Sequence, residues 1–165
     1  MTILVIGLGN PILGDDGAGW RVAEEIARET ANNPEIEADC ASLGGLSLME
    51  RLTGSEHVIL VDTIYTGKKT IGTVSVFPLS ELPDMSAGHT TAVHDTSLRN
   101  ALSVGRSMNI PLPSDQDVLI VAIEAENVFD FSETLSSLVE TAVHHAVKAV
   151  LQLIYSILGE RYDFH

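Results

Sequence analysis

The stretch Met1-Thr-Ile-Leu-Val-Ile-Gly-Leu-Gly-Asn-Pro-Ile-Leu-Gly-Asp-Asp-Gly-Ala-Gly-Trp20 decides the fold of this chain. An apolar run reaches Gly7, and a glycine-rich loop then leads into a pattern whose apolar positions are spaced by three and four residues, as on one face of a helix. The residues of that face are Val22, Ala23, Ile26, Ala27 and Thr30. The stretch therefore predicts a strand, a loop and a helix, and we expect Asp15 or Asp16 to cap the start of the helix.

Strand and helix patterns alternate along the rest of the chain. Strands are predicted at 36–41, 58–62, 73–77 and 117–123, and helices at 46–52, from His94 or Asp95 to about 106, and at 135–158. The run 58–62 is apolar up to its last residue, which is typical of a parallel strand covered on both faces, whereas 73–77 alternates like an antiparallel edge strand. The segment 78–93 has no period and is interpreted as a loop. This order predicts one domain, residues 1–165, folded as a three-layer α/β/α sandwich around a roughly five-stranded, mostly parallel twisted sheet.

The composition narrows the range of partners and locations. With 165 residues, of which 45% are hydrophobic, the chain can bury a real core. Its 9 basic and 23 acidic residues give a formal charge of −14, which repels phosphate backbones and anionic lipid surfaces. The first apolar run is too short for a secretion signal. Polar residues interrupt 135–158, which is therefore interpreted as an amphipathic helix, with Leu138 among the residues that face the core. We expect a soluble, cytoplasmic monomer that binds neither nucleic acid nor membrane, with its single cysteine, Cys40, in the core.

Three acid and imidazole groups, Asp16, Asp62 and His94, each follow an apolar strand or open a helix in this pattern. In an open α/β sheet such positions lie in the crevice beyond the carboxyl ends of the strands, where ligands bind. A cap needs only one carboxylate, so the adjacent acids Asp15 and Asp16 raise a local negative charge that a cation would relieve. Two carboxylates and one imidazole suit a divalent ion such as Ni²⁺ or Zn²⁺ with coordination positions left open.

Each of the three residues also has a simpler interpretation. Asp16 could cap the helix, and Asp62 could accept a hydrogen bond from the turn that follows it. His94 could be a surface or capping histidine, and His89, five residues earlier, competes with it as a ligand. A metal site is predicted only because the three residues occur together in this order.

Several other sites are disfavoured. The turn at Gly7 and Gly9 resembles a dinucleotide-binding loop, but Ile12 stands where that motif needs a third glycine, and the neighbouring acids would repel phosphates. The chain has no Gly-Lys-Ser or Gly-Lys-Thr phosphate loop, no His-Glu-x-x-His zinc motif and no Gly-x-Ser-x-Gly elbow. These absences count against a nucleotide-binding module, the usual zinc-protease arrangement and a serine hydrolase.

Four motifs together resemble a known family. They are Gly7-x-Gly9-Asn10, Asp15-Asp16-Gly17-x-Gly19 opening a helix, Val61-Asp62 ending a strand, and His94-Asp95-x-x-Leu98 opening a later helix. In order and spacing they resemble the nickel-iron hydrogenase maturation endopeptidases, from residue 1 to about 155. The opening motif is the most specific of the four.

The resemblance implies a definite activity. Such enzymes remove a short C-terminal tail from the hydrogenase large-subunit precursor after nickel has been installed, and the nickel, supplied by the precursor, serves as the recognition signal. Asp16, Asp62 and His94 match the family's metal-contacting residues and are the expected catalytic residues, whereas His89 does not match. Some relatives carry an acid where this chain has Leu43.

Two questions stay open from the sequence. The peptide bond could break because the metal polarises the scissile carbonyl or a water, or because Asp16 or Asp62 acts as a general base. A nickel carrier without protease activity and a metal-dependent hydrolase of another substrate are the alternative functions.

Overall fold

The computed structural model describes residues 2–81, 91–126 and 128–159, and the side chains of these residues except those of 91–97. Its five-stranded sheet has the order β2-β1-β3-β5-β4. The strands are β1 (Ile3–Leu8), β2 (Ile36–Ala41), β3 (His57–Ile64), β4 (Val74–Pro78) and β5 (Val118–Glu124). All neighbours pair in parallel except β4, which pairs with β5 in antiparallel fashion at the sheet edge. The expected sheet, including the antiparallel edge strand, is confirmed.

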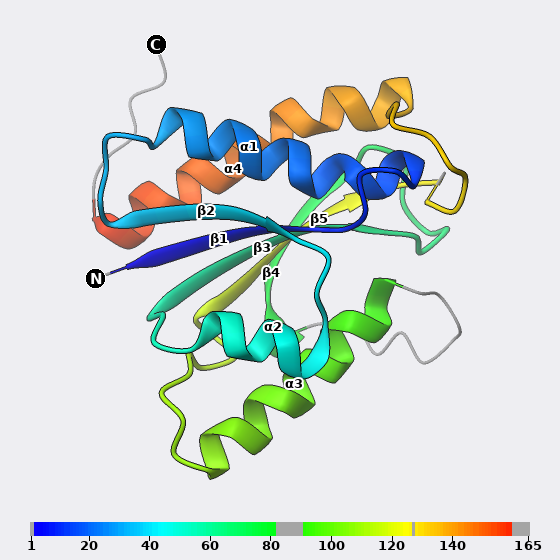
Figure 1. Cartoon of the computed structure of the whole chain (residues 1–165). Helices are drawn as coiled ribbons and strands as arrows, with labels where there is room; N and C mark the ends of the chain where they lie inside the picture. The colour runs from blue at the N-terminus through cyan, green and yellow to red at the C-terminus, as the bar shows by residue number, and fades with distance from the viewer. Residues whose placement is uncertain (1, 82–90, 127, 160–165) are drawn as a thin grey trace.

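Helices cover both faces of the sheet (Figure 1). They are α1 (Ala18–Glu29), α2 (Gly45–Leu52), α3 (Thr91–Ser107) and α4 (Ser137–Leu158). Helices α1 and α4 lie on one face, and α2 and α3 lie on the other (Figure 1). The expected three-layer α/β/α sandwich is confirmed.

The two cores follow from the alternation of side chains along the strands. In β3, Ile59 and Val61 pack toward α1 and α4, whereas Val58 and Leu60 pack toward α2 and α3. All four are fully buried, which explains why the sequence of a strand between two helical layers is apolar throughout rather than alternating.

Strand β3 is longer than its neighbour β1, and this difference creates room for a site. The β1 pairing ends at Gly7 opposite Val61, whereas β3 continues to Ile64 beside β5. The prediction that β3 ends at Asp62 is therefore wrong by two residues. Pairing with β5 extends the strand through Thr63 and Ile64. The apolar run 58–62 gave no signal of this pairing.

Close glycine contacts hold α1 directly against the sheet. A Cβ atom at Gly7 would lie 2.1 Å from the carbonyl oxygen of Gly19, and one at Gly19 would lie 2.5 Å from that of Val61. Any side chain at either position would push the helix away from the strands. The first turn of α1 is thus fixed with respect to β1 and β3.

The amphipathic helices differ from expectation at two positions. Helix α1 buries Val22, Ala23 and Ile26, as predicted, but Ala27 is exposed. Helix α4 buries its apolar stripe against α1 and β5, but Leu138 is 59% exposed because the helix has only just begun there, at the edge of the layer. Among the described helices, α4 is the one whose length and composition would suit a membrane span, a test that core helices also pass.

Helix α3 begins earlier than predicted. It starts at Thr91, inside the segment predicted to be a loop, and a short 3₁₀ helix occupies Leu79–Glu81 at the other end of that segment. Leu98, Ala101 and Leu102 recur at helical spacing, and the apolar face that they form is buried. That face begins after the first turn of the helix. The spacing of its apolar residues therefore could not show that the helix starts at Thr91.

Candidate active site

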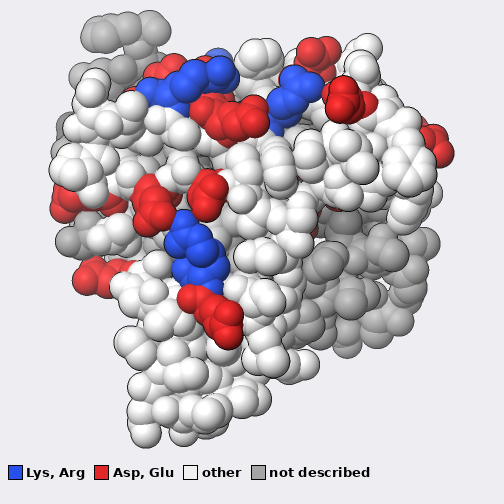
Figure 2. Space-filling model, viewed as in Figure 1, with Lys and Arg blue, Asp and Glu red and all other residues white. Residues whose placement is uncertain are grey.

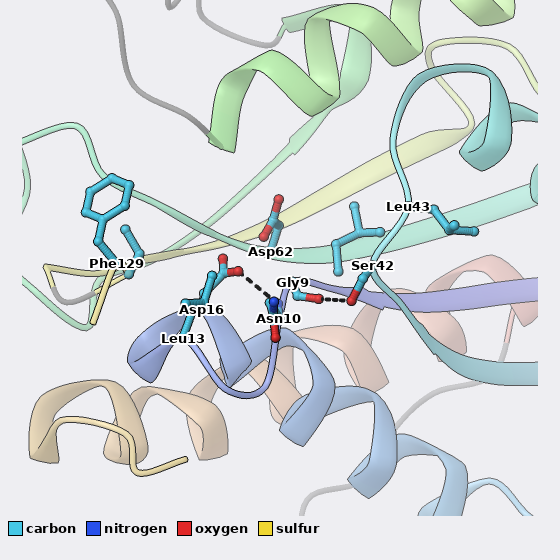
Figure 3. Close-up of a pocket in the computed structure, with 10 residues that line it drawn as sticks. Gly9, Asn10, Leu13, Asp16, Ser42, Leu43, Asp62 and Phe129 are labelled. Atoms are coloured by element: carbon cyan, nitrogen blue, oxygen red, sulfur yellow. Dashed lines mark hydrogen bonds between the residues drawn. The ribbon is translucent and has the colours of Figure 1, made fainter. Parts of the chain in front are cut away.

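A pocket of about 370 Å³ opens where β1 and β3 reach their carboxyl ends. Asp16 and Asp62 both line it, and Leu43 and Phe129 lie on opposite sides of these two acids (Figure 3). The other lining residues are Leu8, Gly9, Asn10, Leu13, Ser42 and Val128. The structure thus brings two of the three predicted site residues together at the edge of the sheet where open α/β proteins bind ligands.

Asp16 reaches the pocket from a 3₁₀ turn, Gly14–Gly17, that precedes α1. One oxygen of its carboxylate, Oδ2, accepts a hydrogen bond from the backbone N–H of Asn10 at 2.8 Å, and the other, Oδ1, accepts one from the hydroxyl of Thr63 at 3.2 Å. The expected capping role is wrong, because the residue that caps α1 is Gly17 and no side chain bonds to the cap. The extra 3₁₀ turn moves both acids upstream of the helix start.

Asp15 is fully buried and serves a different purpose from its neighbour. Its carboxylate accepts hydrogen bonds from the backbone N–H of Ser136 at 2.7 Å and from the Ser136 hydroxyl at 2.9 Å. Ser136 is the residue that caps α4. The charge of Asp15 is therefore neutralised in part by α4, and only Asp16 of the adjacent pair lines the pocket.

Asp62 is 4% exposed and lines the pocket from β3. Its Oδ1 atom accepts a hydrogen bond from the backbone N–H of Thr63 at 2.8 Å. The hydrogen bond expected from the following segment is therefore present. It does not exclude a second role, because a carboxylate offers about four lone-pair positions.

The third predicted residue, His94, is placed only by its backbone. It is the fourth residue of α3, whose first turn lies at the same edge of the sheet as the carboxyl ends of β1 and β3 (Figure 1). Its side chain lies outside the described residues, and the competing His89 lies outside them entirely. Among the side chains that are described, no three His, Cys, Asp or Glu residues form a metal-binding group.

Sequence reasoning missed Thr63, which contacts both acids. It also missed Phe129, which is 58% exposed beside the pocket. The segment carrying Phe129 is held near the loop before α1 by a backbone bridge between Leu13 and Ser132. No local pattern pointed to that bridge, whereas the position of Thr63, next to Asp62, could have drawn attention to its hydroxyl.

A further carboxylate, Glu124, is buried at the end of β5. Its Oε1 atom accepts hydrogen bonds from the backbone N–H and hydroxyl of Thr66 and from the N–H of Gly67. Its Oε2 atom has no hydrogen-bond partner among the described residues. Glu124 thus fastens the loop after β3 to the neighbouring strand.

The ion pairs outside the pocket are mostly exposed. Arg51 of α2 contacts Glu37 and Asp39 of β2, and these acids raise the pKa of its guanidinium. Figure 2 shows basic side chains lying beside acidic ones on one face of the molecule. Such exposed pairs contribute little to stability, about 1 kcal/mol or less each.

Cys40 is partly buried on β2, and its environment disfavours a reactive thiolate. Burial, followed by the negative charges of Glu24 and Asp39, raises its pKa to about 11. The thiol is therefore protonated at neutral pH, which disfavours a nucleophile. The expectation that Cys40 lies in the core is wrong, because β2 is an edge strand and Cys40 is only partly buried on it.

The fold and the pocket define a class of protein: a mostly parallel α/β sandwich with acidic side chains beyond the carboxyl ends of its strands. A model of the hydrogenase maturation protease family (HycI) matches residues 20–153. This chain belongs to that family, and family membership assigns it as a protease. The resemblance noted in the sequence is thereby confirmed.

Individual relatives agree with this assignment. The hydrogenase 2 maturation protease of Escherichia coli K12 is 24% identical over 151 residues, which cover 91% of each chain. Among solved structures, the E. coli maturating endopeptidase HybD has a TM-score of 0.74 at 23% identity, covering 94% of this chain and 93% of that one. HybD from Thermococcus kodakarensis has a TM-score of 0.71 at 22% identity, covering 93% and 99%. These structures share the fold of this chain.

Proposed function

We propose that this chain is an endopeptidase that removes the C-terminal tail of a nickel-iron hydrogenase large-subunit precursor after nickel insertion. The observation that carries the proposal is the meeting of Asp16 and Asp62 in one pocket of a chain that belongs to a maturation-protease family. The precursor is the protein partner, and the enzyme acts on it as a cytoplasmic monomer.

Recognition in this proposal tests whether the precursor carries nickel. Asp16, Asp62 and His94 contact a nickel ion that the thiolates of the precursor already hold. Carboxylate and imidazole groups suit a borderline divalent ion, and three such ligands leave positions for those thiolates. A precursor without nickel offers these three residues nothing to bind, so the tail is left in place.

Peptide cleavage then needs a water that attacks the scissile carbonyl carbon. Asp16 or Asp62 can take a proton from that water and return one to the leaving amide nitrogen, which is general acid–base catalysis. Nickel held by the substrate can instead polarise the carbonyl or the water. Both routes use the same pocket, and both require at least one ionised carboxylate in it.

Intact mass spectrometry of the precursor tests the proposal. The purified chain is mixed with its candidate large-subunit precursor, with and without bound nickel. We expect loss of a C-terminal peptide only from the nickel-loaded sample. An unchanged mass, with the loaded precursor shown to be intact and nickel-bound, would contradict the proposal.

Matched variants assign the residues in the same assay. Asp16→Asn, Asp62→Asn and His94→Ala each remove one proposed nickel contact, and we expect each to abolish or strongly reduce cleavage. Asp39→Asn is the control, because Asp39 is an exposed aspartate whose 3.4 Å contact is to Arg51, away from the pocket. Full cleavage by Asp16→Asn would exclude an essential charge at that residue.

A titration with free Ni²⁺ separates the protease from a nickel carrier. The protease takes its nickel from the precursor, so the isolated chain is expected to bind the free ion weakly. Tight binding without cleavage would instead indicate a carrier.

A further inference from the structure

We propose that Thr63 is a positioning residue that fixes the orientation of Asp16 and Asp62 together and thereby sets the geometry in which both carboxylates meet a divalent cation. This inference deepens the proposed nickel recognition and rests on it. Thr63 itself has no contact with the cation in this account. It acts through the two acids.

Two hydrogen bonds from this one residue carry the inference. The hydroxyl of Thr63 lies 3.2 Å from Oδ1 of Asp16, and its backbone N–H lies 2.8 Å from Oδ1 of Asp62. The first contact spans 47 positions of sequence, so it joins the turn before α1 to the end of β3. Both pocket carboxylates are thus tied to the same residue.

The geometry of β3 explains how one residue reaches both acids. Neighbouring side chains on a strand point to opposite faces of the sheet. Val61 packs toward α1, so Thr63 points to that same face, where the 3₁₀ turn carrying Asp16 contacts β3. Since β1 stops pairing at Gly7, opposite Val61, this turn can occupy the space beside the end of β3.

Burial makes the contact difficult to replace. Thr63 is 0% exposed, so bulk water does not compete for its hydroxyl. Hydrogen bonds to a carboxylate are charge-assisted and stronger than neutral ones. Asp16 has a second donor in the backbone N–H of Asn10, at 2.8 Å, and the two donors together restrict rotation of its side chain.

A restricted carboxylate is a better cation ligand than a mobile one. Groups that orient metal ligands commonly contribute about 10- to 100-fold in metal affinity or activity. Removing the Thr63 hydroxyl takes away one donor to the Asp16 carboxylate and leaves the one from Asn10, so the two acids are held less firmly in one arrangement.

The test compares Thr63→Val with Thr63→Ser in the full chain. Valine keeps the branched shape and the backbone N–H but loses the hydroxyl, whereas serine keeps the hydroxyl. Thr30→Val is the control, because Thr30 is also a buried threonine and donates from its hydroxyl to a carbonyl at 2.7 Å, at the far end of α1. Thermal melting checks that all variants fold.

Three measurements decide the outcome. We expect Thr63→Val to weaken Ni²⁺ binding by about tenfold or more and to raise KM for the nickel-loaded precursor, while Thr63→Ser stays within about threefold of wild type. We also expect the ¹³C shift of the Asp16 carboxyl carbon to change in Thr63→Val and not in Thr30→Val. Wild-type behaviour of Thr63→Val, or an equal loss in Thr63→Ser, would overturn the inference.

The proposed function and the positioning role can fail separately. If wild type neither binds Ni²⁺ nor cleaves the loaded precursor, the proposed function fails. The carboxyl shift of Asp16 then decides the positioning role by itself, because it needs neither nickel nor substrate. An unchanged shift in Thr63→Val would overturn the positioning role even if the protease activity is real.

Discussion

Asp15 and Ser136 are joined by two hydrogen bonds across 121 positions of sequence, from the turn before α1 to the residue that caps α4. Both groups of Ser136 donate, its backbone N–H to Oδ1 and its hydroxyl to Oδ2. This pair fixes the start of the C-terminal helix to the loop that carries the pocket residue Asp16.

Asp15→Ala is therefore expected to lower the free energy of unfolding. The backbone N–H of Ser136 would lose its partner in a part-buried place, which costs about 1 to 3 kcal/mol. Urea unfolding measures the change. Ser136→Ala, which removes only the hydroxyl, should cost less than Asp15→Ala, and an unchanged midpoint for Asp15→Ala would show that the pair does not stabilise the fold.

Gly9→Ala is expected to lower the melting temperature of the chain well below that of wild type. Gly9 has φ +133°, and a Cβ atom there would lie 2.0 Å from the backbone oxygen of Asp16. Gly67→Ala is the control, because Gly67 has φ +66° but open space around its Cβ position, so it carries only the backbone strain of about 1 to 2 kcal/mol. Equal melting temperatures for the two variants would show that the close contact with Asp16 is unimportant.

The thiol of Cys40 should react slowly with iodoacetamide at pH 8. Its pKa is raised from 9.0 to about 11, first by burial, so the folded chain keeps the thiol proton that the unfolded chain releases earlier. The stabilising effect of this group is present below pH 9 and is lost as the pH rises toward 11. Since the chain has one cysteine, mass spectrometry follows its alkylation directly, with the urea-unfolded chain as reference. A rate that levels off by about pH 9 in the folded chain would contradict the raised pKa.

Glu124 offers a test of what a buried carboxylate contributes. Glu124→Gln keeps an oxygen that can accept from Thr66 and Gly67 and removes the charge, so we expect an unchanged or higher unfolding midpoint. Glu124→Ala leaves those donors without an acceptor and is expected to cost about 1 to 3 kcal/mol. If both variants lose the same stability in urea, the charge, rather than the hydrogen bonds, holds the loop.

Local sequence patterns predicted the fold well where burial dominates. The run ending at Asp62 predicted a central parallel strand because both faces of β3 are covered by helices. The meeting of Asp16 and Asp62 also followed from general rules, since parallel strands end at a common edge. The resemblance to the protease family rested instead on four sequence motifs and their order.

The errors arose where distant contacts override local signals. Asp15 was expected near the start of α1 as a cap, but its partner Ser136 belongs to a segment far along the chain. Thr63 stands next to Asp62 in the sequence, but its contact with Asp16 exists only once the sheet has formed. The apolar residues that recur at helical spacing in α3 begin at Leu98, so periodicity could not locate the start of the helix at Thr91.

The tight seating of α1 on the sheet has a consequence for how such an enzyme can diversify. The acids stand on backbone that the contacts of Gly7 and Gly19 hold in place, whereas Leu43 and Phe129 project from loops and are partly exposed. Substitutions at the two apolar side chains are therefore expected to have little effect on folding, whereas a side chain added at Gly7 or Gly19 would displace α1. Adaptation to a different precursor would therefore change Leu43 and Phe129 and leave Asp16 and Asp62 in place.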